Sequence, residues 1–135
     1  MAMIRTGAVN HVALTVTDSE RSRDFYVSLL GFQVMAEFDT TRILSNGGLT
    51  LAVKPASDES RAIKGDCFDE NRVGLDHLSL NVASHAELEN ALAVFKERGI
   101  PHGEIKDLGD MGIYVLAFRD PDNIQVELSA PKSQA

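Results

Sequence analysis

Two histidines occupy matching points of an internal repeat, and imidazole is a common metal ligand and proton carrier in proteins. Residues 9–16 and 75–82 share one pattern, in which the third residue is His11 or His77. In both copies the residues one, three and five positions after the histidine are apolar. Side chains alternate across a β-strand, so these apolar residues form one face and the histidine lies on the other. The pattern therefore predicts two strands with a histidine on the polar face of each.

A carboxylate completes a possible metal-ligand set. The pattern of residues 124–128 predicts a final strand with apolar residues on one face and Gln125 and Glu127 on the other. In the matching strand of the first half, Ala52 falls where Glu127 falls. Two neutral imidazoles and one carboxylate suit a divalent first-row ion such as Fe, Mn, Ni, Co or Zn, and they leave positions open for water or substrate. The sequence therefore predicts a site for one divalent metal ion at three residues: His11, His77 and Glu127.

The repeat continues beyond the histidine strands. Thr17 and Ser84 each stand three residues before a glutamate, which is typical of a helix capping box. Each predicted helix ends at a glycine, Gly31 or Gly99, that suits the left-handed conformation after a helix. Three short extended runs follow each helix, so each half has the order β-α-β-β-β. The expected fold class is α+β, built from two such modules.

The modules are expected at residues 8–55 and 73–130, and the polar, aperiodic residues 56–72 are expected to link them. A chain of 135 residues is long enough for one domain with a real core.

The formal net charge of −7 argues against nucleic acid and anionic membranes as partners, since both require clustered lysine and arginine. Cys67 is the only cysteine, so no intramolecular disulfide can form. With no apolar signal segment near the start, these features favour a cytoplasmic location.

The chain resembles the vicinal-oxygen-chelate (VOC) superfamily over residues 8–130. That superfamily includes glyoxalase I, extradiol dioxygenases, fosfomycin-resistance enzymes and bleomycin-resistance proteins. The resemblance rests on four segments: Asn10-His11, residues 24–32, Asp76-His77 and residues 120–127. It implies paired βαβββ modules whose sheets curl around a metal cavity, with His77 next to Glu127. It also implies a homodimer that takes His11 from one chain and His77 with Glu127 from the other, although one chain could close its own site.

The resemblance further implies a metal-dependent enzyme that acts on a small molecule with two neighbouring oxygens, with the ion as Lewis acid. Lyase or isomerase, transferase and extradiol-type dioxygenase activities all stay open. Four-ligand glyoxalases carry a carboxylate where this chain has Ala52, and fosfomycin thiol transferases usually carry a tyrosine where it has Ala117. The alternative is a metal-free protein that sequesters a ligand or drug, as bleomycin-resistance proteins do. The acidic net charge favours this alternative, whereas the complete His-His-Glu set and the absence of tryptophan oppose it.

Other polar residues are expected near the ion. Strand alternation places Glu37 on one face with Gln33 and Met35, from which it could act as a catalytic base. Four more residues share strand faces with the predicted ligands and are expected to contact substrate or to orient the ligands: Thr15, Ser79, Asn81 and Gln125.

Overall fold

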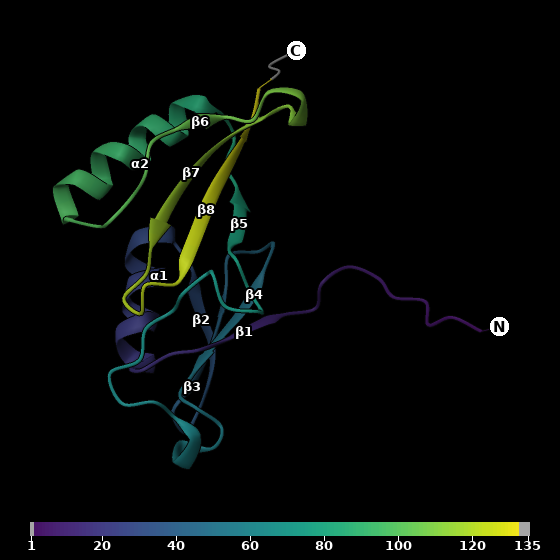
Figure 1. The fold of residues 1–135 in the computed structure, drawn as a ribbon, viewed down its shortest axis with the longest axis vertical. Coiled ribbons are helices and arrows are strands. Elements are labelled where there is room, and N and C mark those ends of the chain that lie inside the picture. Colours follow the sequence, from purple (N-terminus) through teal and green to yellow (C-terminus); the bar gives the residue numbers. More distant parts are fainter. Residues whose placement is uncertain (1, 133–135) are drawn as a thin grey trace. The chain divides into compact units, whose positions relative to one another are not determined.

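The computed structural model describes residues 2–132, which form two compact units. The first unit extends to Asp66 and the second begins at Cys67, a boundary that lies within the expected linker at 56–72. In each unit one helix packs on a mixed four-stranded sheet (Figure 1). This α+β architecture confirms the fold class expected from the repeat.

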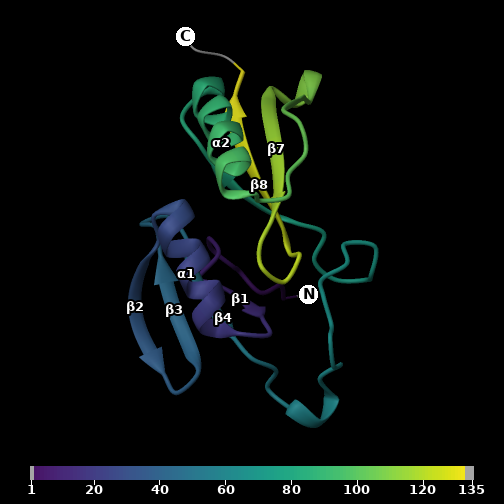
Figure 2. The ribbon, with the colours of Figure 1, turned by 90° about the vertical axis from the view of Figure 1, so that its left-hand side faces the viewer.

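The first unit places its strands in the order β1-β4-β3-β2. Strands β1 and β4 run parallel, and the other neighbours run antiparallel. Helix α1 lies across one face of the sheet and contacts β3 and β4 (Figure 2). Between them Tyr26 and Phe32 are buried with ring centroids 5.9 Å apart. The elements are β1 (Val12–Thr15), α1 (Ser19–Leu30), β2 (Gln33–Phe38), β3 (Thr41–Ser45), β4 (Thr50–Lys54) and the 3₁₀ helix η1 (Glu59–Arg61).

The second unit repeats this topology in the order β5-β8-β7-β6, with β5 and β8 parallel. Helix α2 packs on β7 and β8, over a core that includes Phe95 and Phe118. The first extended run after helix α2 forms a strand of only two residues, Lys106 and Asp107. Before it, His102 forms only an isolated bridge to Phe118. The elements are β5 (Leu78–Asn81), α2 (His85–Arg98), β6 (Lys106–Asp107), the 3₁₀ helix η2 (Gly109–Met111), β7 (Ile113–Arg119) and β8 (Gln125–Pro131).

Strand register confirms the internal alignment of the two halves. Ala13 of β1 pairs with Ala52 of β4, and Ser79 of β5 pairs with Glu127 of β8. In each unit the histidine of the repeat lies two residues before that pair. Ala52 and Glu127 therefore occupy equivalent positions, one beside each histidine strand.

The helix ends are as expected, but neither start has the predicted capping box. Ser84 is the N-cap residue of α2, as predicted, but its side chain makes no capping hydrogen bond. Asp18, not Thr17, caps α1, because its carboxylate accepts hydrogen bonds from two backbone N–H groups of the first turn, each at 3.1 Å. Aspartate is as good an N-cap as threonine, so the helix begins one residue later than predicted. Gly31 and Gly99 end the helices with φ of 74° and 67°, which confirms the predicted stops. No helix within residues 2–132 is long and apolar enough to cross a membrane.

Candidate metal site

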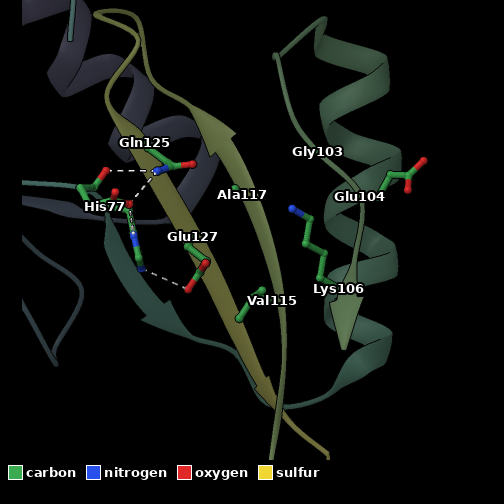
Figure 3. Close-up of a pocket in the computed structure, with 9 residues that line it drawn as sticks. His77, Gly103, Glu104, Lys106, Val115, Ala117, Gln125 and Glu127 are labelled. Carbon is green, nitrogen blue, oxygen red and sulfur yellow. Dashed lines mark hydrogen bonds and ion pairs between the residues drawn. The ribbon is translucent and has the colours of Figure 1, made fainter. Parts of the chain in front are cut away.

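Two of the three predicted ligands lie side by side in the second unit. His77 immediately precedes β5, and Glu127 lies on β8, the parallel neighbour of β5. The His77 Nε2 atom is 3.6 Å from Glu127 Oε1 (Figure 3). The histidine side chain is 40% exposed and the glutamate side chain 17%. Both groups can therefore be reached by an ion from solvent.

The distance between these two atoms suits two ligands of one ion. It is longer than an ordinary hydrogen bond, which spans roughly 2.7 to 3.2 Å. Ligand atoms that each lie about 2.1 Å from a shared ion are roughly 3.0 to 3.5 Å apart. An imidazole nitrogen and a carboxylate oxygen are also ligands that divalent first-row ions accept. The pair therefore fits such an ion after only a small side-chain adjustment.

The third predicted ligand, His11, belongs to the first unit. It lies just before β1, with its side chain exposed and its Nδ1 atom 2.7 Å from Asn10 Oδ1. Among residues 2–132, no group of three or more His, Cys, Asp or Glu side chains is placed to hold a metal ion. The structure thus brings His77 and Glu127 together, and the participation of His11 stays a prediction.

A cavity of about 210 Å³ opens beside Glu127 within the second unit. Figure 3 shows the Lys106 side chain directed toward β7 at Ala117, whereas Glu104 points away. Across residues 2–132, no hydrogen bond or ion pair engages the Lys106 ammonium. This cation is therefore available to a ligand in the cavity. The lining residues are Asp76, His77, Gly103, Glu104, Lys106, Val115, Ala117, Gln125 and Glu127.

The residues expected around the ligands fall into two groups. In the second unit, Gln125 donates hydrogen bonds to Asp76, and Ser79 Oγ lies 2.6 Å from Ser129 Oγ. Asn81 lies farther along β5, opposite Ser129. Thr15 lies in the first unit, where it pairs with Lys54 of β4. The roles assigned to these four residues from the sequence stay predictions.

Glu37 does not lie on the face that strand alternation predicts. Its Oε1 atom is 3.2 Å from both Arg23 Nη1 on α1 and Arg42 Nε on β3, so it faces the helix. The reason is a β-bulge at Met35, between Val34 and Ala36, which shifts the pairing of β2 with β3 and reverses the alternation. The expected role of Glu37 as a base depended on its lying on the opposite face of β2. Because it faces the helix, we do not propose that role further.

Two residues of the site were missed from the sequence. Lys106 follows an irregular segment, so no strand periodicity indicates which way it points. Asp76 does carry a signal, because each repeat histidine directly follows a residue with a side-chain carbonyl or carboxylate oxygen, Asn10 or Asp76. Each of these oxygens accepts a hydrogen bond from the Nδ1 atom of the following histidine, at 2.7 Å.

An ion pair anchors the segment that leads to His77. Arg119 of β7 donates to both carboxylate oxygens of Glu70, at 2.9 and 2.8 Å. These hydrogen bonds lower the pKa of Glu70 from 4.5 to about 2. A carboxylate with a lowered pKa stabilises the fold above its unfolded-state pKa, and the stabilisation is lost as the pH falls through the folded-state value.

We therefore expect Glu70→Gln to lower the free energy of unfolding at neutral pH, by an amount that shrinks between pH 4.5 and about 2. Denaturant unfolding across this pH range checks the prediction. Glu97→Gln, the same charge change at an exposed position of α2, is the control. Its free energy of unfolding should show the same pH dependence as that of the wild type. Equal pH dependence of the wild type and Glu70→Gln would contradict it.

Comparison with known proteins finds relatives of similar sequence. A catechol-2,3-dioxygenase from Bacillus subtilis (strain 168) is 27% identical over 128 residues, which are 94% of this chain and 42% of that protein. This chain therefore spans less than half the length of the dioxygenase. The metallothiol transferase FosB from Staphylococcus saprophyticus is 28% identical over 124 residues, covering 90% of this chain and 75% of that protein.

The fold has solved relatives as well. The structure of a glyoxylase/bleomycin resistance protein/dioxygenase domain from Frankia sp. EAN1pec superposes with a TM-score of 0.79 at 30% identity, covering 97% of this chain and 96% of that one. Residues 8–128 match the family model that describes the same group of proteins. The chain belongs to the Glyoxalase/Bleomycin resistance protein/Dioxygenase superfamily.

Proposed function

We propose that this protein is a metal-dependent enzyme that acts on a small anionic substrate with two neighbouring oxygens. The observation that supports this most strongly is the 3.6 Å separation of His77 Nε2 and Glu127 Oε1. His77, Glu127 and His11 would hold one divalent ion. When bound, that ion would act as a Lewis acid toward negative charge developing on the substrate oxygens.

The other cavity residues would bind and orient the substrate. Lys106 would attract an anionic group, because its ammonium is directed into the cavity that Glu127 lines. Ala117 pairs with Glu127 across β7 and β8, and its small side chain leaves room beside the carboxylate. The cavity of about 210 Å³ in this unit is smaller than pockets for drug-sized molecules, which are about 300 Å³ or more. This size favours a small metabolite.

The reaction class depends on the ion and on the groups that can move a proton. Ala52, at the position equivalent to Glu127, can neither bind metal nor act as a base, which disfavours isomerisation by a carboxylate there. The similarity to a catechol-2,3-dioxygenase and to a metallothiol transferase favours ring cleavage or nucleophilic addition. Iron in the purified protein would favour the dioxygenase reaction, and Mn, Ni, Co or Zn would favour addition.

We further propose that the protein forms a cytoplasmic homodimer. A second copy could supply His11 to the His77–Glu127 pair, and the single cysteine fits a reducing compartment. Sedimentation equilibrium tests the assembly. A monomer that binds one ion per chain at full affinity would contradict a site shared between chains.

Elemental analysis of the purified protein, followed by chelation and reconstitution with each candidate ion, tests the metal-dependent function. We expect one ion per chain and loss of turnover on chelation. A protein that holds no divalent ion even after reconstitution would overturn the proposal. That result, together with ligand binding unchanged in a triple His11, His77 and Glu127 alanine variant, would support metal-free sequestration.

The role of Lys106 gives a separate prediction. Oxalate, a small dianion with neighbouring oxygens, should bind the metal-loaded protein about tenfold more weakly after Lys106→Met, because one hydrogen bond to a charged group is lost. Isothermal titration calorimetry measures this affinity. Lys96→Met on α2 removes the same charge away from the cavity and should leave oxalate affinity unchanged. Equal oxalate affinity in the wild type and Lys106→Met would contradict the role of Lys106.

A further inference from the structure

Asp76 fixes the ring of the adjacent histidine. Its Oδ1 atom lies 2.7 Å from His77 Nδ1. An ionised carboxylate can only accept hydrogen bonds, so Nδ1 must carry the proton. The Nε2 atom of the neutral ring then presents its lone pair toward Glu127, 3.6 Å away. The contact thus favours the tautomer whose Nε2 atom is free to bind a metal ion.

Asp76 is itself held in place. Its side chain is 66% exposed, so water competes for its oxygens. Gln125 counters this by donating from Nε2 to both the backbone oxygen of Asp76, at 3.1 Å, and its Oδ1, at 3.2 Å. Gln125 lies two residues before Glu127 on the same face of β8, and Figure 3 shows it beside His77. Strand β8 therefore carries Glu127, a predicted ligand, and also Gln125, which holds Asp76 in place beside His77.

The first unit has a weaker version of this arrangement. Asn10 Oδ1 lies 2.7 Å from His11 Nδ1, which is the same contact with a neutral amide in place of a carboxylate. Thr50 occupies the position equivalent to Gln125. Between residues 2 and 66, no side chain is seen to hold Asn10 as Gln125 holds Asp76. A hydrogen bond to a charged acceptor is roughly twice as strong as one to a neutral acceptor.

We infer that Asp76, secured by Gln125, is the positioning residue of the metal site, and that His77 is therefore a stronger histidine ligand than His11. This inference rests on the proposed function. A carboxylate partner orients a metal-bound imidazole and increases its basicity, and removal of such a partner typically weakens metal binding by about 10- to 100-fold. The two repeat histidines are therefore equivalent in position but unequal as ligands.

The first test uses the metal-free protein. Nitrogen-15 NMR of the histidine rings, at a pH where His77 is neutral, reports which nitrogen carries the proton. We expect the Nδ1–H tautomer for His77 in the wild type and in Asp76→Asn, which keeps an acceptor oxygen. Asp76→Ala should shift His77 to a tautomer mixture. A wild-type His77 in the Nε2–H form, or no shift in Asp76→Ala, would overturn the positioning role.

The second test compares zinc affinities by competition with a chelator. We expect about 10- to 100-fold weaker binding in Asp76→Ala. Asp76→Asn should lose about tenfold, and Gln125→Leu should weaken binding in the same direction. Asn10→Ala should lose less than Asp76→Ala. Asp110→Ala, at an exposed aspartate of η2, is the matched control and should bind as the wild type. Unfolding midpoints measured in parallel identify variants that fail to fold.

Equal losses in Asp76→Ala and Asn10→Ala would refute the inequality of the two histidines. Wild-type affinity in Asp76→Ala would refute the positioning role. If the wild type itself bound no zinc or other divalent ion, the proposed metal function would fail, and the NMR experiment would still decide whether Asp76 sets the His77 tautomer.

Discussion

Replacing His77 with alanine should weaken binding of the divalent ion by more than about 100-fold, because a direct ligand contributes more than its hydrogen-bonding partner. Glu127→Ala should have a comparable effect, since Glu127 Oε1 is the group that faces His77 Nε2. Chelator competition with the metal-loaded protein measures both losses. The effects should not be additive, because loss of either residue already removes the pair that defines the site.

The second unit offers a matched control for the histidine. His85 lies at the start of α2 with its side chain 45% exposed, and it contacts Glu89 and the ring of Tyr114. His85→Ala removes an imidazole of similar exposure without touching the cavity residues, so metal affinity should not change. Wild-type affinity in His77→Ala, or an equal loss in His85→Ala, would contradict the assignment of His77 as a ligand.

The largest stability effect is expected at Phe118. This side chain is 1% exposed, and the centroid of its ring lies 4.6 Å from the ring centroid of Phe95 on α2. Phe118 sits beside Ala117, the residue of β7 that pairs with Glu127. Phe118→Ala should therefore destabilise the protein by about 3 to 5 kcal/mol through the cavity that it leaves. Denaturant unfolding followed by circular dichroism measures this cost.

The chain also provides a control for the phenylalanine. Phe38, at the end of β2, is 63% exposed. The same change there, Phe38→Ala, should alter the free energy of unfolding by no more than about 0.5 kcal/mol. Similar costs at the two positions would mean that Phe118 does not support the fold as its burial indicates.

Most of the fold follows from short-range patterns in the sequence. Alternating apolar residues predict the two equivalent strands β1 and β5, although His11 and His77 lie just before these strands and not within them. The glycines at 31 and 99 end both helices. The correspondence of Ala52 with Glu127 also follows from the repeat, and strand register confirms it. These features depend on neighbours within a few residues, or on comparison of one half with the other.

The details that escaped prediction depend on contacts between distant residues. A bulge at Met35 turns Glu37 toward Arg23 and Arg42, and a pattern of strict alternation cannot reveal such a bulge. Lys106 reaches the cavity from β6, a strand of two residues that is too short for periodicity to indicate where its side chain points. The hydrogen bonds from Gln125 to Asp76 join residues 49 positions apart, and only the pairing of β5 with β8 brings them together.

The most direct test of the metal site is an anomalous difference map from crystals of the reconstituted protein, recorded at the absorption edge of the bound ion. We expect one peak per chain within about 2.0 to 2.2 Å of both His77 Nε2 and a Glu127 carboxylate oxygen, with His11 of the same or a second chain as the third ligand. A peak bound elsewhere, or none between His77 and Glu127 in protein that contains a stoichiometric ion, would contradict the account.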